Sequence, residues 1–229
     1  MTEAYSVAAP NRIRRVMAAR MRQSATEIPQ VTLQATADAE QLASGGGGTG
    51  GPRVTVTTRL LQVVAQTLAR HSRINSVVVD GETRLYETVN LGVATATSQG
   101  LLVPVIRDAG ALPLTEIADQ LASLRERAEG GLLRLEEMTG GTFTVTNLGP
   151  YGVGHFSPLV NPPQVAILGV GALEPRLGLA GGEPAVRTCL PLSLTFDHAA
   201  IDGAEAAAFL HDLAQAIASY QPDPPPERT

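Results

Sequence analysis

The amino-acid sequence predicts an α+β fold in which helices cover one mixed β-sheet. Some segments repeat apolar residues at helical spacing and others at strand spacing. The two kinds do not alternate strictly along the chain, as they would in a doubly wound fold. With 229 residues, 44% of them hydrophobic, the chain is long and apolar enough for one large domain, or at most two small ones, with a sizeable core.

Four segments predict helices. Residues 12–22 and 54–71 repeat apolar residues with the i, i+3, i+4 spacing of a helix that packs on one side. Residues 114–129 show the same pattern strongly, and two glycines follow as a stop signal. Residues 202–220 predict an alanine-rich helix. Arginines on the outer face of segment 12–22 predict either a solvated or subunit-facing helix, or contacts with the phosphates of an anionic cofactor.

The first half of the chain predicts several strands. Val31, Leu33 and Ala35 alternate with polar residues, as in a strand with one buried face, and a short helical pattern follows them. Asp80-Gly81 marks a turn between two strands within residues 74–97. Residues 100–110 are nearly continuously apolar, which predicts a strand buried on both faces.

Three further strands are predicted nearer the end of the chain. Glycines bound the strand in residues 139–149, and the apolar run of 164–173 predicts another strand buried on both faces. Residues 189–198 alternate leucine with other residues, so we expect a half-buried strand that delivers its polar end to a turn. Cys189 lies inside this strand and is expected to be a small core residue.

These elements predict one folded domain over residues 11–220. A flexible N-terminal arm, residues 1–10, is expected before it, and a disordered proline-rich tail, residues 221–229, after it. Within the domain, residues 45–52 hold six glycines and predict a flexible loop rather than a phosphate-binding loop.

Composition excludes several classes of function. All 17 basic residues are arginine, so this sequence cannot contain a Schiff-base lysine or a P-loop lysine. The net charge of −5 argues against general nucleic-acid binding, and no apolar run is long enough to predict a membrane helix. The single cysteine cannot form an intramolecular disulfide, and residues 1–10 lack the pattern of a secretory signal, so a cytoplasmic location is expected.

The segment 196–203 carries the strongest local signal for chemistry. His198 is placed where a strand opens onto a helix, and Asp202 stands at the position of a helix cap. A surface histidine and a capping aspartate are one interpretation. In the other, His198 is a general base, because an imidazole titrates near ~6.5 and can accept a proton from a thiol near neutral pH.

The second signal is the threonine pattern of residues 140–149, GGTFTVTNLG. Alternation places Thr142, Thr144 and Thr146 on one side of the strand. Threonine is a good strand former, so a polar strand face is the plain interpretation. Alternatively, Thr146 donates a hydrogen bond to a developing oxyanion.

A metal site is not expected. His198 and Asp202 stand four residues apart, but a catalytic zinc usually takes three protein ligands. His155 and His211 show no ligand spacing with this pair.

Several separate stretches together resemble the catalytic domain of the dihydrolipoyl acyltransferases of 2-oxoacid dehydrogenase complexes. The resemblance covers about residues 11–218 and is carried by RIRRVMAARMRQS, VNLGVATATSQGLLVPVIRDA, GGTFTVTNLG, NPPQVAILGVG and FDHAAIDG. It implies the fold of chloramphenicol acetyltransferase, an α+β sandwich. The H-x-x-x-D-G pattern alone is weak, whereas its combination with the other stretches in this order is highly specific.

The resemblance implies an acyltransferase that moves an acyl group between coenzyme A and a dihydrolipoyl thiol. His198 is then the catalytic base, Thr146 the oxyanion donor, and Asp202 a mainly structural residue that holds the loop through a salt bridge to a basic residue. The family forms homotrimers with the active-site channel between subunits, so His198 of one copy would face Thr146 of the next. 2-Oxoacid dehydrogenase and dihydrolipoyl dehydrogenase components are the further partners that it implies.

The sequence departs from the family pattern at several places. Ala199 stands where the family usually has arginine after the histidine, which puts local ion pairing and substrate choice in question. Because there is no lysine to carry lipoate, a lipoyl-bearing protein would act in trans. The polar end of the chain lacks the apolar anchor that joins trimers in larger cores, so an isolated trimer is expected.

Two other functions remain open from the sequence. A stand-alone transferase would keep acyl-CoA as donor and use another acceptor, such as a small amine or hydroxyl. A non-catalytic trimeric scaffold would keep the fold alone, although the presence of both His198 and Thr146 argues against it.

Overall fold

The computed structural model describes residues 6, 9–44, 54–180 and 182–221. The predicted glycine-rich loop of residues 45–52 lies outside the described residues. Most of the predicted arm of residues 1–10 and of the predicted tail of residues 221–229 lies outside them too.

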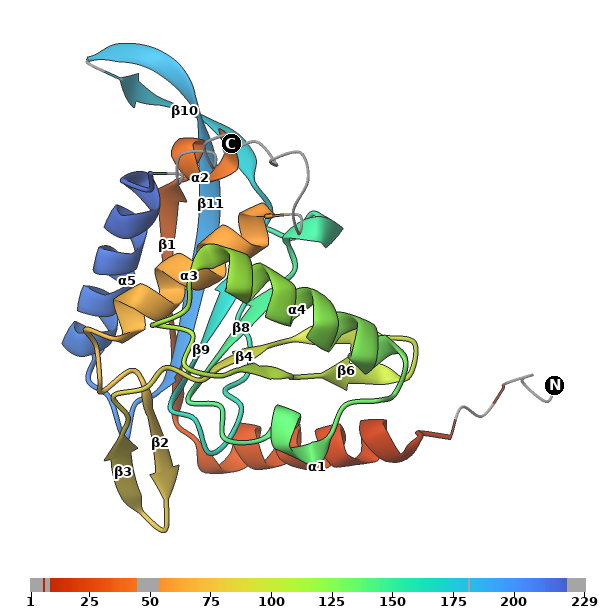
Figure 1. Cartoon of the computed structure of the whole chain (residues 1–229). Helices are drawn as coiled ribbons and strands as arrows, with labels where there is room; N and C mark the ends of the chain where they lie inside the picture. Colours follow the sequence, from red (N-terminus) through yellow and green to blue (C-terminus); the bar gives the residue numbers. More distant parts are fainter. Residues whose placement is uncertain (1–5, 7–8, 45–53, 181, 222–229) are drawn as a thin grey trace, which may run out of the picture.

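A mixed seven-stranded sheet forms the centre of the fold, which confirms the predicted class (Figure 1). Its strand order is β1-β11-β9-β8-β4-β7, and β10 pairs with the outer part of β11. The pairs β4–β8 and β8–β9 are parallel, and the other pairs are antiparallel. The strands of this sheet are β1 (Gln30–Asp38), β4 (Leu91–Val93), β7 (Val105–Ile106), β8 (Phe143–Asn147), β9 (Ala166–Val170), β10 (Glu174–Ala180) and β11 (Glu183–Asp197).

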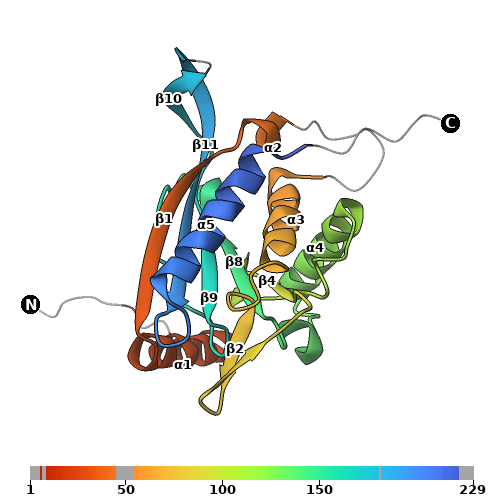
Figure 2. The same cartoon turned by 90° about the vertical axis from the view of Figure 1, so that its left-hand side faces the viewer.

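Helices cover one face of this sheet (Figure 2). The described residues form the helices α1 (Arg12–Glu27), α2 (Glu40–Ser44), α3 (Val56–Leu68), α4 (Leu114–Glu129) and α5 (Gly203–Ala218), and the short 3-10 helices η1 (Leu135–Met138) and η2 (Gly149–Tyr151). α5 packs on β1 and on α3, and α3 packs on α4. The rings of Phe143 on β8 and Phe209 on α5 meet edge to face at 5.9 Å in the core between them.

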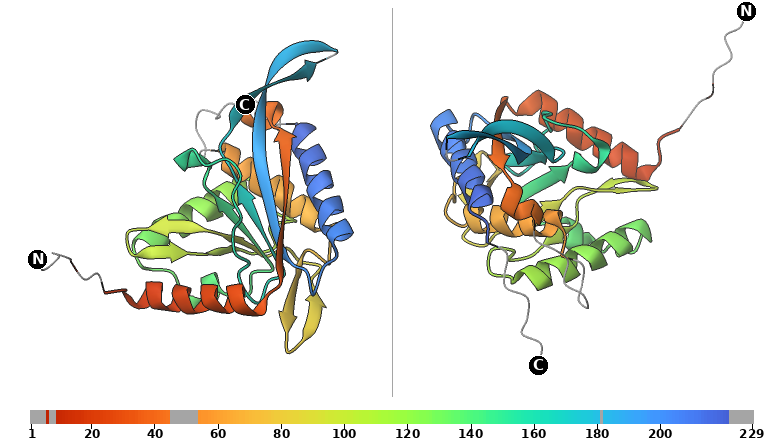
Figure 3. Two further views of the ribbon diagram at one scale, coloured as in Figure 1. Left: turned by 180° about the vertical axis from the view of Figure 1, so that it is seen from behind. Right: turned by 90° about the horizontal axis from the view of Figure 1, so that it is seen from above.

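The predicted helices are confirmed, with clear starting signals. Asn11 caps α1 because its side-chain Oδ1 accepts the backbone N–H of Arg14 at 2.8 Å. Thr55 caps α3 in the same way with Thr58. Helix α1 lies across the lower end of the sheet in Figure 3, and its buried Ser24 donates to the carbonyl of Val160 at 2.6 Å.

In the described part of the chain, two small hairpins stand outside the main sheet. β2 (Ser76–Val79) and β3 (Glu82–Leu85) flank the turn predicted at Asp80-Gly81, which is confirmed. Both turn residues have positive φ, 53° and 78°, as a tight hairpin turn requires. β5 (Thr95–Thr97) pairs with β6 (Gly100–Leu102) in the second hairpin.

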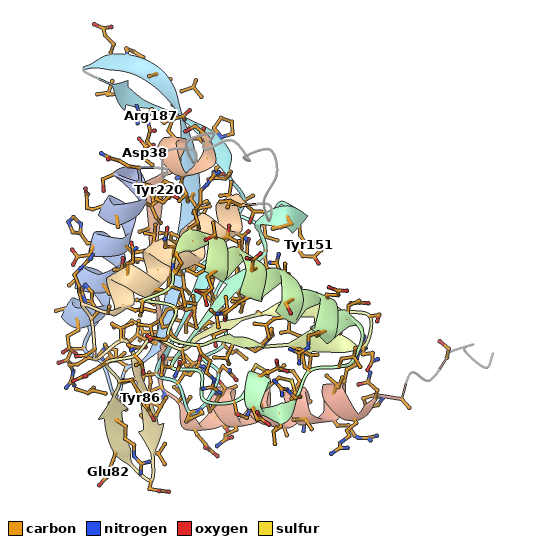
Figure 4. All side chains as sticks on the ribbon, viewed as in Figure 1. Asp38, Glu82, Tyr86, Tyr151, Arg187 and Tyr220 are labelled. Carbon is orange, nitrogen blue, oxygen red and sulfur yellow. The ribbon has the colours of Figure 1, made fainter. Side chains whose placement is uncertain are left out.

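The outer part of β11 leaves the sheet together with β10 and projects as an arm (Figure 1). An ion pair between Asp38 and Arg187 lies at the base of this arm (Figure 4). Leu177 on the arm is 79% exposed. Cys189 is half-buried there, opposite Asp38. Burial is the main cause that raises the pKa of its thiol, and the nearby Asp38 carboxylate raises this pKa further.

The prediction for residues 100–110 is wrong. Instead of one strand buried on both faces, this segment forms β6 in the small hairpin and β7 in the main sheet. Pro104 stands between them, and proline has no N–H to continue a ladder. Leu101 is 42% exposed, so apolar composition alone overstated the burial of this run.

The prediction of a half-buried strand over residues 189–198 is also wrong. Residues 190–197 of β11 are buried on both faces. The leucines face the helices, and the alternate residues Ser193 and Thr195 are covered as well, with Thr195 hydrogen-bonded to Thr32 of β1 at 2.8 Å. The strand position is confirmed, but the face that we expected to meet solvent is buried.

Glu137 links α4 to the 3-10 helix before β8. The backbone N–H of Arg134 and the guanidinium of Arg127 both bond its carboxylate and hold the pKa of Glu137 below that of an ordinary glutamate. A carboxyl whose pKa is lowered in the folded state stabilises the fold at pH values above its pKa in the unfolded state. This contribution is lost as the pH falls through the lowered pKa. We therefore expect Glu137→Gln to lower the melting temperature near neutral pH, with a difference that shrinks as the pH falls through the lowered pKa of Glu137. Thermal unfolding by circular dichroism measures both, and a difference that grows in acid would contradict this assignment.

Candidate active site

A row of polar or small residues crosses the sheet on the face opposite the helices. Thr146 of β8 pairs with Gly169 of β9, and Gly169 pairs with Ser193 of β11. Residues directly opposite each other in neighbouring strands point to the same side. The row therefore presents the Thr146 and Ser193 hydroxyls on the same face of the sheet, on either side of the gap that Gly169 leaves between them.

The segment after β8 folds back over this row. The ring edge of Phe156 fills the gap, because a Cβ at position 169 would meet Phe156 Cζ at 2.9 Å. Only glycine leaves that space. Next to it, the His155 ring lies over β11 and β1. Its Nδ1 is 3.5 Å from Ser193 Oγ, and its Nε2 is 3.4 Å from Thr36 Oγ1. Phe156 and His155 form the cover that the strand pattern did not predict.

Thr146 lies near the end of β8 and is half-buried. The strand end is held by Asn147, whose Oδ1 accepts the backbone N–H of Gly149 at 2.8 Å. Within the described part of the chain the Thr146 hydroxyl makes no hydrogen bond, whereas Thr144 on the same side bonds Gln164 at 2.5 Å. Thr146 thus presents a donor that is held by the sheet and available to a ligand.

His198 lies exposed in the turn that follows β11. Its backbone N–H donates to the carbonyl of Pro29 at 2.9 Å, and its ring lies 5.6 Å from that of Phe196. The buried Asp197 shapes the turn, because its Oδ1 accepts the backbone N–H of Ala199 at 2.9 Å. The imidazole nitrogens form no hydrogen bond to the residues that the structure describes.

Asp202 stands at the N-cap of α5, as predicted. Its backbone N–H donates to Glu205 Oε2 at 3.1 Å. The ion pair at this helix start joins Arg73 to Glu205 at 2.8 Å. Among the described residues, therefore, Asp202 does not form the predicted salt bridge. The ion pair at this helix start is formed by Glu205 instead.

Thr146 and His198 do not meet within one chain. Ser193, the β11 residue level with Thr146, lies two strands away and four residues before Asp197. With about 3.3 Å per residue and about 4.8 Å between strands, the Cα atoms of Thr146 and Asp197 are about 16 Å apart. One chain alone cannot place both side chains on a single reacting carbonyl.

The residues that the structure describes lack both a metal-binding cluster and a membrane-spanning helix. They contain no group of three or more His, Cys, Asp or Glu side chains that could hold a metal ion. Nor do they contain a helix that is both long and apolar enough to cross a membrane.

Sequence reasoning missed several residues around these groups. Asp197 carried a signal, because an aspartate side chain often accepts the backbone N–H two residues later and so stabilises a turn, as it does here with Ala199. His155 was considered only as a metal ligand. Arg73 contacts the turn at Ala200, which follows it by 127 positions in the sequence, and no local pattern predicts such a contact.

Residues 2–222 match the family model of the 2-oxoacid dehydrogenases acyltransferase catalytic domain. A relative in Bacillus subtilis, the dihydrolipoyllysine-residue acetyltransferase component of its acetoin cleaving system, is 39% identical over 219 residues, 93% of this chain. The chain spans only 54% of that relative's length.

Solved structures agree in fold. A probable dihydrolipoamide acetyltransferase from Listeria monocytogenes superposes with a TM-score of 0.91 at 28% identity, covering 96% of this chain and 97% of that one. Chloramphenicol acetyltransferase shares the fold with a TM-score of 0.54 at 12% identity, over 87% of this chain and 94% of that one. The predicted chloramphenicol acetyltransferase-like fold is confirmed.

A third structure bears on the site residues. It is the Azotobacter vinelandii dihydrolipoamide acetyltransferase, with a TM-score of 0.89 at 32% identity over 94% of this chain and 92% of that one. It was studied for the role of a serine, a histidine and an asparagine in its catalytic mechanism, separated by 52 and 4 positions. Thr146, His198 and Asp202 have the same two separations. With its fold, and with the family model matching nearly its whole length, this chain belongs to the 2-oxoacid dehydrogenase acyltransferase family, as a catalytic domain.

Proposed function

We propose that the protein transfers an acyl group between coenzyme A and a dihydrolipoyl thiol, as the catalytic core of a 2-oxoacid dehydrogenase complex. The observation that carries this proposal is the triplet Thr146, His198 and Asp202. Within a chain of this family, it has the spacing of the three residues studied for catalysis in the Azotobacter enzyme. The exposed imidazole and the unbonded hydroxyl have the chemistry that the reaction needs.

The proposed mechanism uses His198 as general base and then general acid. Its imidazole takes the proton of the attacking thiol, and the thiolate forms a bond to the thioester carbonyl carbon. Thr146 donates a hydrogen bond to the oxygen that becomes negative in the tetrahedral intermediate. When the intermediate collapses, the bond to the old sulfur breaks, and this sulfur receives the proton from His198. No covalent enzyme intermediate is required.

The separation of about 16 Å within one chain supports a site shared between two copies. We propose a homotrimer in which His198 of one copy faces Thr146 of the next. Repeating one such contact around a threefold axis closes a ring with three equal sites. A lipoyl-bearing protein supplies the dithiol in trans, dehydrogenase components are the further partners, and a cytoplasmic location is part of the same proposal.

Mixing two inactive variants tests the shared site. We expect His198→Ala and Thr146→Ala chains to be inactive separately. Denatured together in equal amounts and refolded, they should recover about a quarter of wild-type activity, because random pairing gives about one interface in four both intact groups. The assay follows thioester formation from acyl-CoA and free dihydrolipoamide. Activity that stays at the level of the separate variants would place both groups in one chain's site and contradict the proposal.

Two controls complete this test. Wild-type protein put through the same refolding fixes the recoverable activity. Light scattering should give about 72 kDa for wild type and mixture alike, three times the chain mass of 23.9 kDa. A correctly assembled wild type that uses an amine or hydroxyl acceptor, but not dihydrolipoamide, would indicate a stand-alone transferase. A trimer without turnover on any of these acceptors would indicate a scaffold.

A further inference from the structure

Arg73 reaches the turn of His198 from another part of the fold. It lies between α3 and β2, and its Nη2 donates to the backbone carbonyl of Ala200 at 3.2 Å. Its Nε lies 2.8 Å from Glu205 Oε1 on the first turn of α5. One guanidinium therefore holds both the turn and the helix that follows it.

Glu205 completes the connection. Its second oxygen, Oε2, accepts the backbone N–H of Asp202 at 3.1 Å. The contacts thus run from the Ala200 carbonyl through Arg73 and Glu205 to the Asp202 amide, and they span the stretch directly after His198. On the other side of His198, Asp197 Oδ1 holds the Ala199 amide at 2.9 Å.

The turn has little other side-chain support of its own. Residues 199 and 200 are alanines, whose methyl groups cannot form hydrogen bonds. The exposed fractions of the two side chains are 53% for Arg73 and 36% for Glu205, so this ion pair contributes little to global stability. Its effect is on the local position of the turn.

We infer that Arg73 and Glu205 form a clamp that positions His198 for proton transfer. This inference rests on the proposed function for its kinetic consequence. Both are positioning residues, because they act on the backbone around His198 and through it on the imidazole. Small displacements of a reacting group have large effects on rate, even when they leave the fold unchanged.

Kinetics of Arg73→Gln, Glu205→Gln and the double variant test the clamp. We expect each single change to lower kcat about 3- to 10-fold with KM within about twofold, because geometry rather than binding is altered. The double variant should be no worse than the singles, because either change breaks the one series of contacts that joins the Ala200 carbonyl to the Asp202 amide. Arg84→Gln is the matched control. Arg84 is an exposed arginine paired with Asp80 at 3.9 Å on the β2–β3 hairpin, and its change should leave kcat unchanged.

Nuclear magnetic resonance gives a readout that does not depend on turnover. In protein with labelled histidine, the His198 imidazole signals are assigned by their loss in His198→Ala. We expect Arg73→Gln to shift or broaden them, while Arg84→Gln leaves them in place and both variants keep the wild-type melting temperature within about 2 °C, as expected for a surface pair.

Three outcomes would overturn the clamp: unchanged kcat with unchanged His198 signals, losses that multiply in the double variant, or a raised KM at constant kcat. Failure of the proposed function looks different. In that case wild type transfers no acyl group to any acceptor, and the His198 signals alone decide whether the clamp exists.

Discussion

His198→Ala should reduce kcat about 1,000- to 10,000-fold, the largest loss expected from any single substitution in this protein. In the proposed mechanism the same imidazole takes the proton from the attacking thiol and returns it to the leaving sulfur, so its removal affects both halves of the reaction. The side chain is exposed and unbonded among the described residues, and we therefore expect the melting temperature to change little. Steady-state kinetics with acyl-CoA and dihydrolipoamide measure the loss.

His211→Ala is the matched control for this variant. His211 lies exposed on α5, and its truncation removes an equally large side chain at a distance from the turn. It should keep wild-type kcat. Wild-type turnover in folded, trimeric His198→Ala would show that the base has been assigned to the wrong residue.

Thr146→Val should lower kcat about 100- to 1,000-fold. Valine keeps the shape and the strand preference of threonine but has no hydroxyl, so the proposed oxyanion loses a hydrogen-bond donor. KM should change far less than kcat, because the donor matters most in the transition state.

Thr146→Ser separates the hydroxyl from the rest of the side chain. Serine keeps the donor and should retain kcat within about tenfold, the loss reflecting a less restricted χ1. The Azotobacter relative was studied with a serine at the equivalent spacing. Equal kcat for the valine and serine variants would exclude the oxyanion role of Thr146.

Much of the fold could be predicted because its elements carry strong local patterns. The helix over residues 114–129 was placed to the residue, since its apolar stripe ends at two glycines. Burial was harder to predict. On the second face of β11, Ser193 contacts His155 and Thr195 contacts Thr32, and such contacts join residues that are far apart in the sequence.

The candidate site was predictable only in part. Motifs selected His198 and Thr146, but these residues are 52 positions apart, and periodicity alone does not connect them. The structure adds their separation across two strands, and this is a property of the strand order β11-β9-β8 rather than of any local segment. Arg73 lay beyond prediction, because its contact with Ala200 is formed only when the loop before β2 packs beside α5.

The strand order has one more consequence in the proposed arrangement. If the base comes from one protomer and the donor from another, a dissociated protomer holds half of each site and catalyses nothing. By mass action, specific activity then depends on protein concentration and falls on dilution as protomers separate. Substrates that span the interface would oppose this dissociation, so saturating acyl-CoA should protect dilute enzyme from inactivation.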